Sequence, residues 1–166
     1  MVSGTDLYSL TATPGYLTLQ CADKSVKERC VPAFVSRRMQ HHEFNATTRM
    51  YFNPETNDEK AGLLLFKDET HHLFMAVSQS PNGRIISLIK TDGQEDKVLA
   101  TNTLPENAIC FDLRVVSKGT SYEFAYSLDK GETWMVLATD VDANHLSTAT
   151  AGGFTGSTIA LYATNK

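Results

Sequence analysis

The chain has 166 residues, of which 42% are hydrophobic and 20% are charged, and its formal net charge is −4. This length suits one domain with a buried core, and the composition is that of an ordinary soluble globular protein. The basic residues form no stripe, which argues against binding to nucleic acid. No apolar run approaches the roughly 18 residues of a membrane helix, so no membrane partner is expected.

Three cysteines, Cys21, Cys30 and Cys110, are spread along the chain. Cys21 and Cys30 flank a polar loop and could pair if oxidised. Three reduced thiols are the simpler interpretation, because no disulfide framework is visible. No C-x-x-C spacing suggests a zinc site.

The first elements in chain order are two short strands within residues 8–20, separated by a Pro14-Gly15 turn. A charged loop follows, and then a long two-part strand, Ala33 to Met39 and Phe44 to Phe52, which we expect to organise the sheet. From Phe44 onward apolar and polar side chains alternate strictly, which predicts a strand with one buried face.

Short segments separated by turn signals make up the rest of the chain. The segment Ala61 to Lys67 is apolar on both faces and predicts a central strand, and residues 81–83 (Pro-Asn-Gly) predict a hairpin turn. One helical turn is expected within Val141 to Leu146. Further strands are predicted at Thr70 to Gln79, Arg84 to Thr91, Lys97 to Ala100, Ala108 to Ser117, Thr120 to Leu128, Trp134 to Leu137 and Gly156 to Thr164.

This pattern predicts an all-β fold of two packed antiparallel sheets, in a single domain that spans residues 1–166. Ile109 is expected to be buried with its strand. The residues expected inside the sandwich are Phe44, Met50, Phe111, Leu113, Phe124 and Ile159.

The segment Ser127 to Trp134 fits the pattern S-x-D-x-G-x-T-W and looks like the Asp-box hairpin of sialidases and other β proteins. Asp129 is expected to accept backbone N–H groups across the turn, Gly131 to adopt a positive φ, and Trp134 to pack on the hairpin. A sialidase needs several such blades and an arginine cluster, so the structural interpretation is preferred.

Candidate catalytic and metal-ligating residues do not form a convincing site. His41-His42 and His71-His72 are neighbours in sequence, and neighbouring side chains of a strand point to opposite faces. Most acids lie in turns, where they are usually solvated, so no carboxylate pair for glycoside hydrolysis is apparent. We therefore predict no catalytic residue, no metal and no cofactor in this chain.

An aromatic residue flanked by glycines, Phe154, precedes the last predicted strand, within residues 151–156 (Ala-Gly-Gly-Phe-Thr-Gly). Either the segment is a β-bulge with Phe154 turned into the core, or it is a loop that presents Phe154 to a partner. The residue pattern leaves both interpretations open.

Several segments together resemble a known family, the C-terminal domain of glycoside hydrolase family 43 β-xylosidases and α-L-arabinofuranosidases. The resemblance extends from about Tyr8 to Thr164, and its most specific parts are F-x-x-R-R-x-Q-H and G-F-T-G. The segments that carry it are residues 14–17, 34–41, 61–63, 126–129, Trp134 and 153–156.

The resemblance implies a concanavalin A-like jelly-roll sandwich that packs against a catalytic β-propeller and is itself non-catalytic. It further implies that Phe154 reaches into the neighbouring sugar pocket, so that the partners would be the propeller and a xylo- or arabino-oligosaccharide. With no signal peptide visible, the compartment stays open between bacterial cytoplasm and periplasm.

Two alternatives from other functional classes remain: a free-standing carbohydrate-binding module that uses exposed aromatics such as Tyr51, and a purely structural sandwich. Family members also carry a strand of the type D-F-D-[YW]-F after the strand that matches Ile159 to Ala163, and this sequence does not contain it. We therefore expect a free sheet edge, which makes a homo-oligomer a possible assembly.

Overall fold

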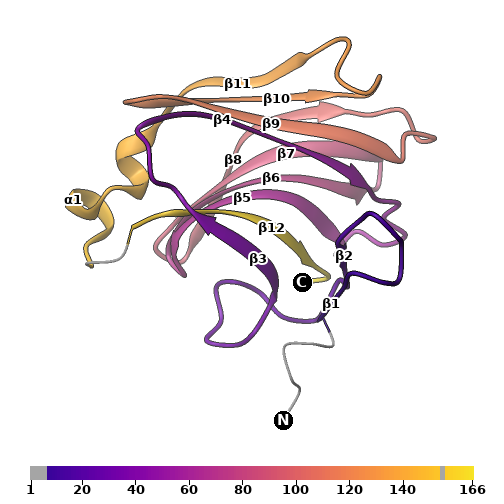
Figure 1. Cartoon of the computed structure of the whole chain (residues 1–166), viewed down its shortest axis with the longest axis horizontal. Helices are drawn as coiled ribbons and strands as arrows, with labels where there is room; N and C mark the ends of the chain where they lie inside the picture. The colour runs from indigo at the N-terminus through magenta and orange to yellow at the C-terminus, as the bar shows by residue number, and fades with distance from the viewer. Residues whose placement is uncertain (1–6, 154–155) are drawn as a thin grey trace.

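The computed structural model describes residues 7–153 and 156–166, and it shows two antiparallel sheets packed face to face (Figure 1). One sheet has six strands in the order β3-β12-β5-β6-β7-β8, and the other has four in the order β11-β10-β9-β4. The predicted all-β fold of two antiparallel sheets is therefore confirmed. Within the described ranges, no helix is long and apolar enough to cross a membrane.

The strands have the following bounds. The six-stranded sheet contains β3 (Ala33–Arg38), β5 (Lys60–Asp68), β6 (His71–Ser80), β7 (Gly83–Asp92), β8 (Glu95–Thr103) and β12 (Thr158–Thr164). The four-stranded sheet contains β4 (Glu43–Tyr51), β9 (Cys110–Lys118), β10 (Ser121–Ser127) and β11 (Met135–Asp142). A separate small hairpin pairs β1 (Tyr8–Ser9) with β2 (Thr18–Leu19), and the helical elements are η2 (Ala143–Leu146) and α1 (Thr148–Ala151).

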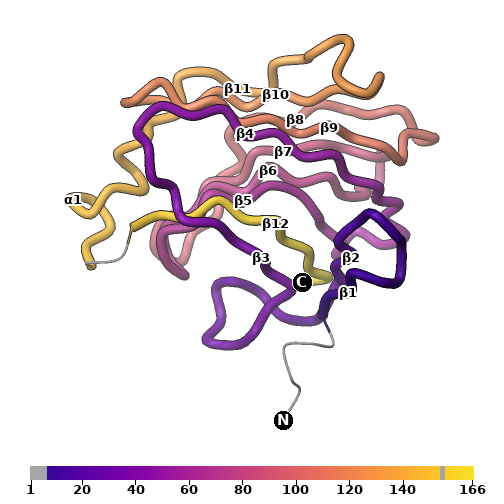
Figure 2. The backbone as a smooth tube through the Cα atoms, in the orientation of Figure 1, coloured from indigo at the N-terminus to yellow at the C-terminus, as the bar shows by residue number. Residues whose placement is uncertain are grey.

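The two halves of the predicted organising strand belong to different sheets. β3 pairs with β12, with Arg38 opposite Thr158, whereas β4 pairs with β9, with Met50 opposite Phe111. The chain crosses from one layer to the other through residues 39–42, and the trace of Figure 2 follows this crossing. Ser117 Oγ donates to the carbonyl oxygen of His42 at 2.5 Å, which fixes the start of β4.

The core lies between the two sheets and is only partly as predicted. The side chains of Phe111, Leu113 and Phe124 are completely buried. The three other residues expected inside, Phe44, Met50 and Ile159, pack against the core but stay partly exposed. Phe44 and Met50 lie on β4, which has a neighbour on one side only, and Ile159 lies beside the edge strand β3.

Some predicted boundaries and one predicted burial are wrong. Ile109 is 51% exposed, because β9 begins one residue later, at Cys110. The strand expected at Lys97 to Ala100 extends over Glu95–Thr103, and the strand expected at Trp134 to Leu137 extends to Asp142. The central position of β5, the hairpin at residues 81–83 and the helical turn before Ser147 are confirmed.

Gly62 of β5 lies opposite Ala76 of β6, close to the backbone of that strand. A Cβ atom added at this position would lie 1.9 Å from the carbonyl oxygen of Met75, which is a backbone atom of the neighbouring strand. A side chain here therefore requires the central strands of the larger sheet to separate.

We predict that Gly62→Ala lowers the free energy of unfolding by about 3 kcal/mol or more, because inserting a methyl group against a fixed backbone forces the backbone to shift. Denaturant unfolding followed by circular dichroism measures the loss. Gly156→Ala is the matched control, since its added Cβ would meet nothing nearer than 4.0 Å. Equal stability of the two variants would contradict the close approach.

Two histidines are buried at the end of the sandwich where η2 lies. His145 Nε2 donates to the carbonyl oxygen of Thr91 at 2.7 Å, and the His145 ring lies 5.4 Å from that of His71. His72 Nδ1 donates to the carbonyl oxygen of Asp68 at 3.2 Å. Burial lowers the pKa of both His72 and His145, because the protonated ring is poorly solvated inside the protein. For His145, the nearby charge of Lys90 lowers the pKa further, whereas that of Asp92 raises it.

These pKa shifts predict a loss of stability in weak acid. The unfolded chain binds more protons than the folded chain below the ordinary histidine pKa of about 6.5, so the stabilisation is complete above that pH and falls below it. The melting temperature should drop less between pH 7.5 and pH 5.5 for His145→Gln than for the unmodified protein. His42→Gln, at an exposed histidine, is the control. The same drop in His145→Gln and the unmodified protein would refute the assignment.

Candidate functional site

A basic, exposed surface forms where the end of β3 meets the loop that follows α1. We call it the arginine–loop surface and define it by Arg37, Arg38, Gln40, His41, Gly152, Gly153 and Gly156, all of which are exposed. It lies at the end of the sandwich where Figure 1 shows α1 and the beginning of β4. All of its members except Gly152 come from the two most specific segments of the sequence resemblance.

The pairing of β3 with β12 brings these two segments side by side. Beyond the last strand pair, Arg38 with Thr158, the contact continues, because Met39 N donates to the carbonyl oxygen of Ser157 at 2.9 Å. The Cβ position of Gly156 lies 4.0 Å from Cδ of Arg38. Segments more than 100 residues apart in sequence therefore form one continuous surface.

The loop of this surface is held together at its base, the stem, by a hydrogen bond between residues 146 and 157, and Gly152 and Gly153, which we call its tip, are exposed. Ser157 Oγ donates to the carbonyl oxygen of Leu146 at 2.9 Å and closes the stem, and Ser147 caps the short helix α1 by accepting from Thr150 N. At the tip, Gly152 and Gly153 have φ angles of 74° and 73°, a region that favours glycine. Among residues 7–153 and 156–166, no atom outside the adjoining chain lies within 4 Å of their Cβ positions. Phe154, the predicted site residue, lies outside the described residues.

The arginine–loop surface carries positive charge on a chain whose net charge is −4. Within residues 7–153 and 156–166, neither Arg37 nor Arg38 forms an ion pair. The predicted histidine pairs do not assemble into a metal centre: in the same ranges, no three His, Cys, Asp or Glu side chains gather into a group fit to hold a metal ion. The charge of the surface therefore suits an acidic partner rather than a cation.

The predicted Asp-box turn is present after β10. Ser127 Oγ donates to Asp129 at 2.6 Å and Thr133 N donates to it at 2.8 Å, and these bonds lower the pKa of Asp129 to about 2. Gly131 has a φ of 88° and packs against Trp134, as predicted. The bonds of Ser127 and Asp129 are local, which is the arrangement of a structural hairpin, and the one long-range bond shown for the turn holds it to the sheet, from Arg49 Nη2 to the carbonyl oxygen of Lys130 at 3.0 Å.

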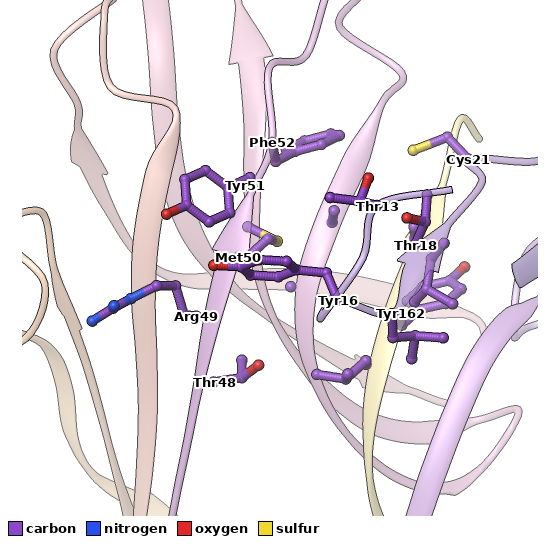
Figure 3. Close-up of a pocket in the computed structure, with 16 residues that line it drawn as sticks. Thr13, Tyr16, Thr18, Cys21, Thr48, Arg49, Met50, Tyr51, Phe52 and Tyr162 are labelled. Atoms are coloured by element: carbon purple, nitrogen blue, oxygen red, sulfur yellow. The ribbon is translucent and has the colours of Figure 1, made fainter. Parts of the chain in front are cut away.

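A pocket of about 490 Å³ opens at the other end of the sandwich, between the β1–β2 hairpin, the end of β4 and β12 (Figure 3). We call it the tyrosine pocket. Tyr16 and Tyr51 meet edge to face at its mouth, with ring centroids 5.4 Å apart, and they are 43% and 54% exposed. The neighbouring Tyr16 hydroxyl and Cys110 thiol raise the pKa of Tyr51 to about 12.

The sides of the tyrosine pocket combine apolar and hydroxyl-bearing residues. Met50 of β4 and Phe52, just after the strand, supply apolar side chains, and Thr13 and Thr18 are hydroxyl-bearing residues of the lining. In Figure 3 the Arg49 side chain points away from the tyrosines, consistent with its hydrogen bonds to Asp112 at 2.7 and 2.8 Å. This composition is typical of a small-molecule or peptide site, and its volume falls in the usual range.

Sequence reasoning named Tyr51 but missed the pocket around it. Most of its lining comes from three segments that only the fold brings together. They are Thr13 to Leu19, Thr48 to Phe52 and Leu161 to Ala163. The one sequence signal was the Pro14-Gly15 turn immediately before Tyr16. The tyrosine pocket and the arginine–loop surface lie at opposite ends of the molecule, so they are separate candidate sites.

Nearly the whole chain is similar in sequence to known proteins. Residues 3–166 match the model of the family described as "Beta xylosidase C-terminal Concanavalin A-like domain". The chain is 34% identical over 163 residues to a putative beta-xylosidase of Escherichia coli, and 28% identical over 164 residues to a xylosidase/arabinosidase of Butyrivibrio fibrisolvens. These matches cover 94% and 97% of this chain but only 30% of each relative.

Solved structures agree with the sequence matches. A GH43B protein of Bacteroides ovatus superposes with a TM-score of 0.90 at 25% identity, and a GH43 protein of Bacillus licheniformis with a TM-score of 0.88 at 26% identity. Each match covers nearly all of this chain, 96% and 97%, and 31% of the longer one. The chain therefore belongs to the family of β-xylosidase C-terminal concanavalin A-like domains, the sandwich region of glycoside hydrolase family 43 proteins.

Proposed function

We propose that this chain is the non-catalytic partner of a family 43 catalytic propeller, that it docks through the arginine–loop surface, and that Phe154 completes the propeller's sugar pocket. The observation that carries the proposal is the convergence of the R-R-x-Q-H segment with Gly153 and Gly156, the two described residues of the G-F-T-G segment, on one exposed surface. The relatives are three times longer than this chain, so their activity and substrates belong to the proposal.

The charge of the surface supports docking to an acidic partner. Arg37 and Arg38 stand side by side in the sequence at the end of an edge strand, exposed and without an ion pair among the described residues. Arginine forms two parallel hydrogen bonds with a carboxylate, which makes it well suited to an interface. A glycosidase pocket contains carboxylates, so a neighbouring basic surface is electrostatically complementary to it.

The construction of the loop supports a role for Phe154 in the pocket. The stem between Leu146 and Ser157 is closed by a hydrogen bond, and Gly152 and Gly153, which precede Phe154, are exposed. A large aromatic residue next to exposed glycines would suit a contact site if it is itself exposed. There its ring would cover the apolar face of a sugar and exclude water from the reacting bond.

The test replaces the matching region of the Escherichia coli relative with this chain and measures hydrolysis of aryl-xylosides and aryl-arabinosides by the hybrid. Phe154→Ala should lower kcat/KM about tenfold or more, because the sugar loses a covering ring, and it should leave the melting temperature nearly unchanged. Phe154→Tyr keeps the ring and should retain most activity. Val98→Ala, at an exposed residue of β8, is the surface control.

Two outcomes would refute this assignment. Full activity of the Phe154→Ala hybrid would remove Phe154 from the sugar pocket. A large fall in the melting temperature of Phe154→Ala would instead indicate core burial, since truncating a buried Phe costs about 3–5 kcal/mol.

The tyrosine pocket favours a second candidate function, the binding of an oligosaccharide by the sandwich alone. Exposed tyrosine rings provide an apolar face and a hydroxyl group, and the threonines of the pocket add donors and acceptors for sugar hydroxyls. Such binding would take place at the end of the molecule opposite the arginine–loop surface.

Calorimetry with xylo-oligosaccharides distinguishes the two candidates. If the pocket binds sugar, titration gives micromolar to low-millimolar affinity, and Tyr51→Ala weakens it about tenfold, while Phe154→Ala has no effect. If the chain acts only by docking, the isolated protein shows no binding that Tyr51→Ala alters.

A further inference from the structure

The segment between β2 and β3 passes over the outer face of the six-stranded sheet, the face turned away from the four-stranded sheet (Figure 1). We call its residues 24–28 the strap. On one side Thr164 Oγ1 of β12 donates to the carbonyl oxygen of Lys24 at 3.0 Å. On the other side Lys27 Nζ donates to Asp96 Oδ1 of β8 at 3.0 Å. The strap therefore crosses β5, β6 and β7, which lie between those two strands.

A cavity of about 320 Å³ lies between the strap and the sheet, and we call it the strap cavity. Its apolar lining includes Phe74 of β6, Ile89 of β7 and Tyr162 of β12, and the rings of Phe74 and Tyr162 are 4.9 Å apart. Val26 of the strap packs with these two rings in a cluster separate from the core between the sheets. The volume is at the lower end of the usual range for small-molecule sites, about 300–1,000 Å³, so the cavity suits one small ligand.

The polar part of the strap cavity is held together by its own hydrogen bonds. His72 of β6, Thr91 of β7 and Asp96 of β8 line it together with Lys27 of the strap. Thr91 Oγ1 and Lys27 Nζ both donate to Asp96 Oδ1, at 2.6 and 3.0 Å. The arrangement of this part therefore rests on contacts among residues that lie well inside the described ranges.

His72 has one ring nitrogen that the protein leaves unused. The residue is only 4% exposed, and burial lowers its pKa, which favours the neutral ring. Nδ1 donates to the carbonyl oxygen of Asp68, so Nε2 carries the lone pair. Among residues 7–153 and 156–166, no group donates to Nε2. Because a buried acceptor without a donor costs free energy, Nε2 favours a ligand that brings a hydroxyl group.

Tyr162 supplies the complementary group in the same cavity. Its hydroxyl oxygen accepts from Val26 N at 3.2 Å. In the part of the chain that the structure describes, the O–H group of Tyr162 has no acceptor of its own. The strap cavity thus offers one unused acceptor and one unused donor, and an alcohol hydroxyl can bind to either.

The charged side chains of the strap cavity are already engaged with one another. Lys27 pairs with Asp96 at 3.0 Å, and Lys166 pairs with Glu28 at 2.5 Å. Lys60 Nζ donates to the carbonyl oxygen of Lys166 at 3.1 Å. A charged ligand would have to compete with these pairs, which favours an uncharged one. A sugar ring is uncharged, carries hydroxyl groups on its rim and has an apolar C–H face that suits aromatic rings.

We propose that the strap cavity binds one uncharged monosaccharide, whose hydroxyl groups bond to His72 Nε2 and to the Tyr162 hydroxyl while an apolar face of the sugar lies toward Phe74. The inference does not depend on the proposed function, because no residue of the arginine–loop surface lines this cavity. Tyr162 also lines the tyrosine pocket, so the test has to separate the two sites.

The test follows the backbone amide resonances of the ¹⁵N-labelled chain by NMR during titration with D-xylose or D-glucose. We expect a dissociation constant on the order of 1–10 mM, because a ligand of so few atoms gains little binding free energy. Resonances of the strap and of β6 should shift saturably, and those around Tyr51 should not. Sodium D-glucuronate should bind at least about tenfold more weakly than D-glucose, since its carboxylate finds no free partner.

Two substitutions at His72 form a matched pair. His72→Asn keeps a donor near the position of Nδ1 and removes the acceptor at Nε2, so the affinity for D-xylose should fall about fivefold or more. His72→Gln places an amide oxygen near the position of Nε2 and should bind within about twofold of the unmodified chain. Circular dichroism checks that each variant is folded.

Two further variants make the test independent of His72. Ile89→Trp fills the strap cavity with a larger side chain and removes no polar group, so it should abolish binding at a half-buried position where the fold tolerates the change. Tyr51→Ala, in the tyrosine pocket, should leave the affinity for D-xylose unchanged. If His72→Asn does not fold, Ile89→Trp decides.

Each result bears on the proposal. It is overturned by the absence of saturable shifts up to about 50 mM sugar, by shifts centred on the tyrosine pocket, by full binding in Ile89→Trp, or by equal affinities of His72→Asn and His72→Gln. Binding of D-glucuronate as tight as that of D-glucose would also overturn it. Binding at the strap that His72→Asn weakens, Ile89→Trp abolishes and Tyr51→Ala leaves unchanged supports it.

Discussion

The architecture depends on the crossing between β3 and β4 at residues 39–42. Because this short segment passes from one layer to the other, consecutive strands become edges of opposite sheets. Both edges lie on the same flank, where Phe44 and Met50 of β4 stay partly exposed. The arginine–loop surface forms at the crossing itself, where β3 ends and β4 begins.

Much of the fold was predictable because strand periodicity is a local property. Alternating side chains identified β4, and the apolar run at β5 identified a central strand, since a strand buried on both faces needs apolar residues on both. Sequence pattern does not show which sheet a strand joins, so the separation of β3 from β4 was not predicted. The length of β8 was missed because Val98 and Leu99 lie on an exposed edge, where burial does not impose alternation.

The candidate sites were predictable to different degrees. The resemblance predicted Phe154 as a site residue and contained Arg37 and Arg38 only as part of a motif, and β-sheet pairing explains why the arginines lie beside Gly156. The tyrosine pocket combines residues from the N-terminal hairpin, β4 and β12, and no local pattern indicates that such distant segments converge. The burial of His145 was equally hidden, because its partner is a backbone carbonyl, that of Thr91, which the residue type does not reveal.

The bond between Ser157 Oγ and the carbonyl oxygen of Leu146 also bears on how this domain family can diversify. This bond holds the two ends of the loop together. Both ends therefore stay attached to the sandwich at the same positions, whatever residues lie between them. Lengthening a closed surface loop costs little entropy, about 0.6 kcal/mol for each doubling. Insertions or exchanged residues within the loop would therefore alter the exposed surface of the domain without altering the framework. The loop is a natural place to graft new sequence onto this sandwich.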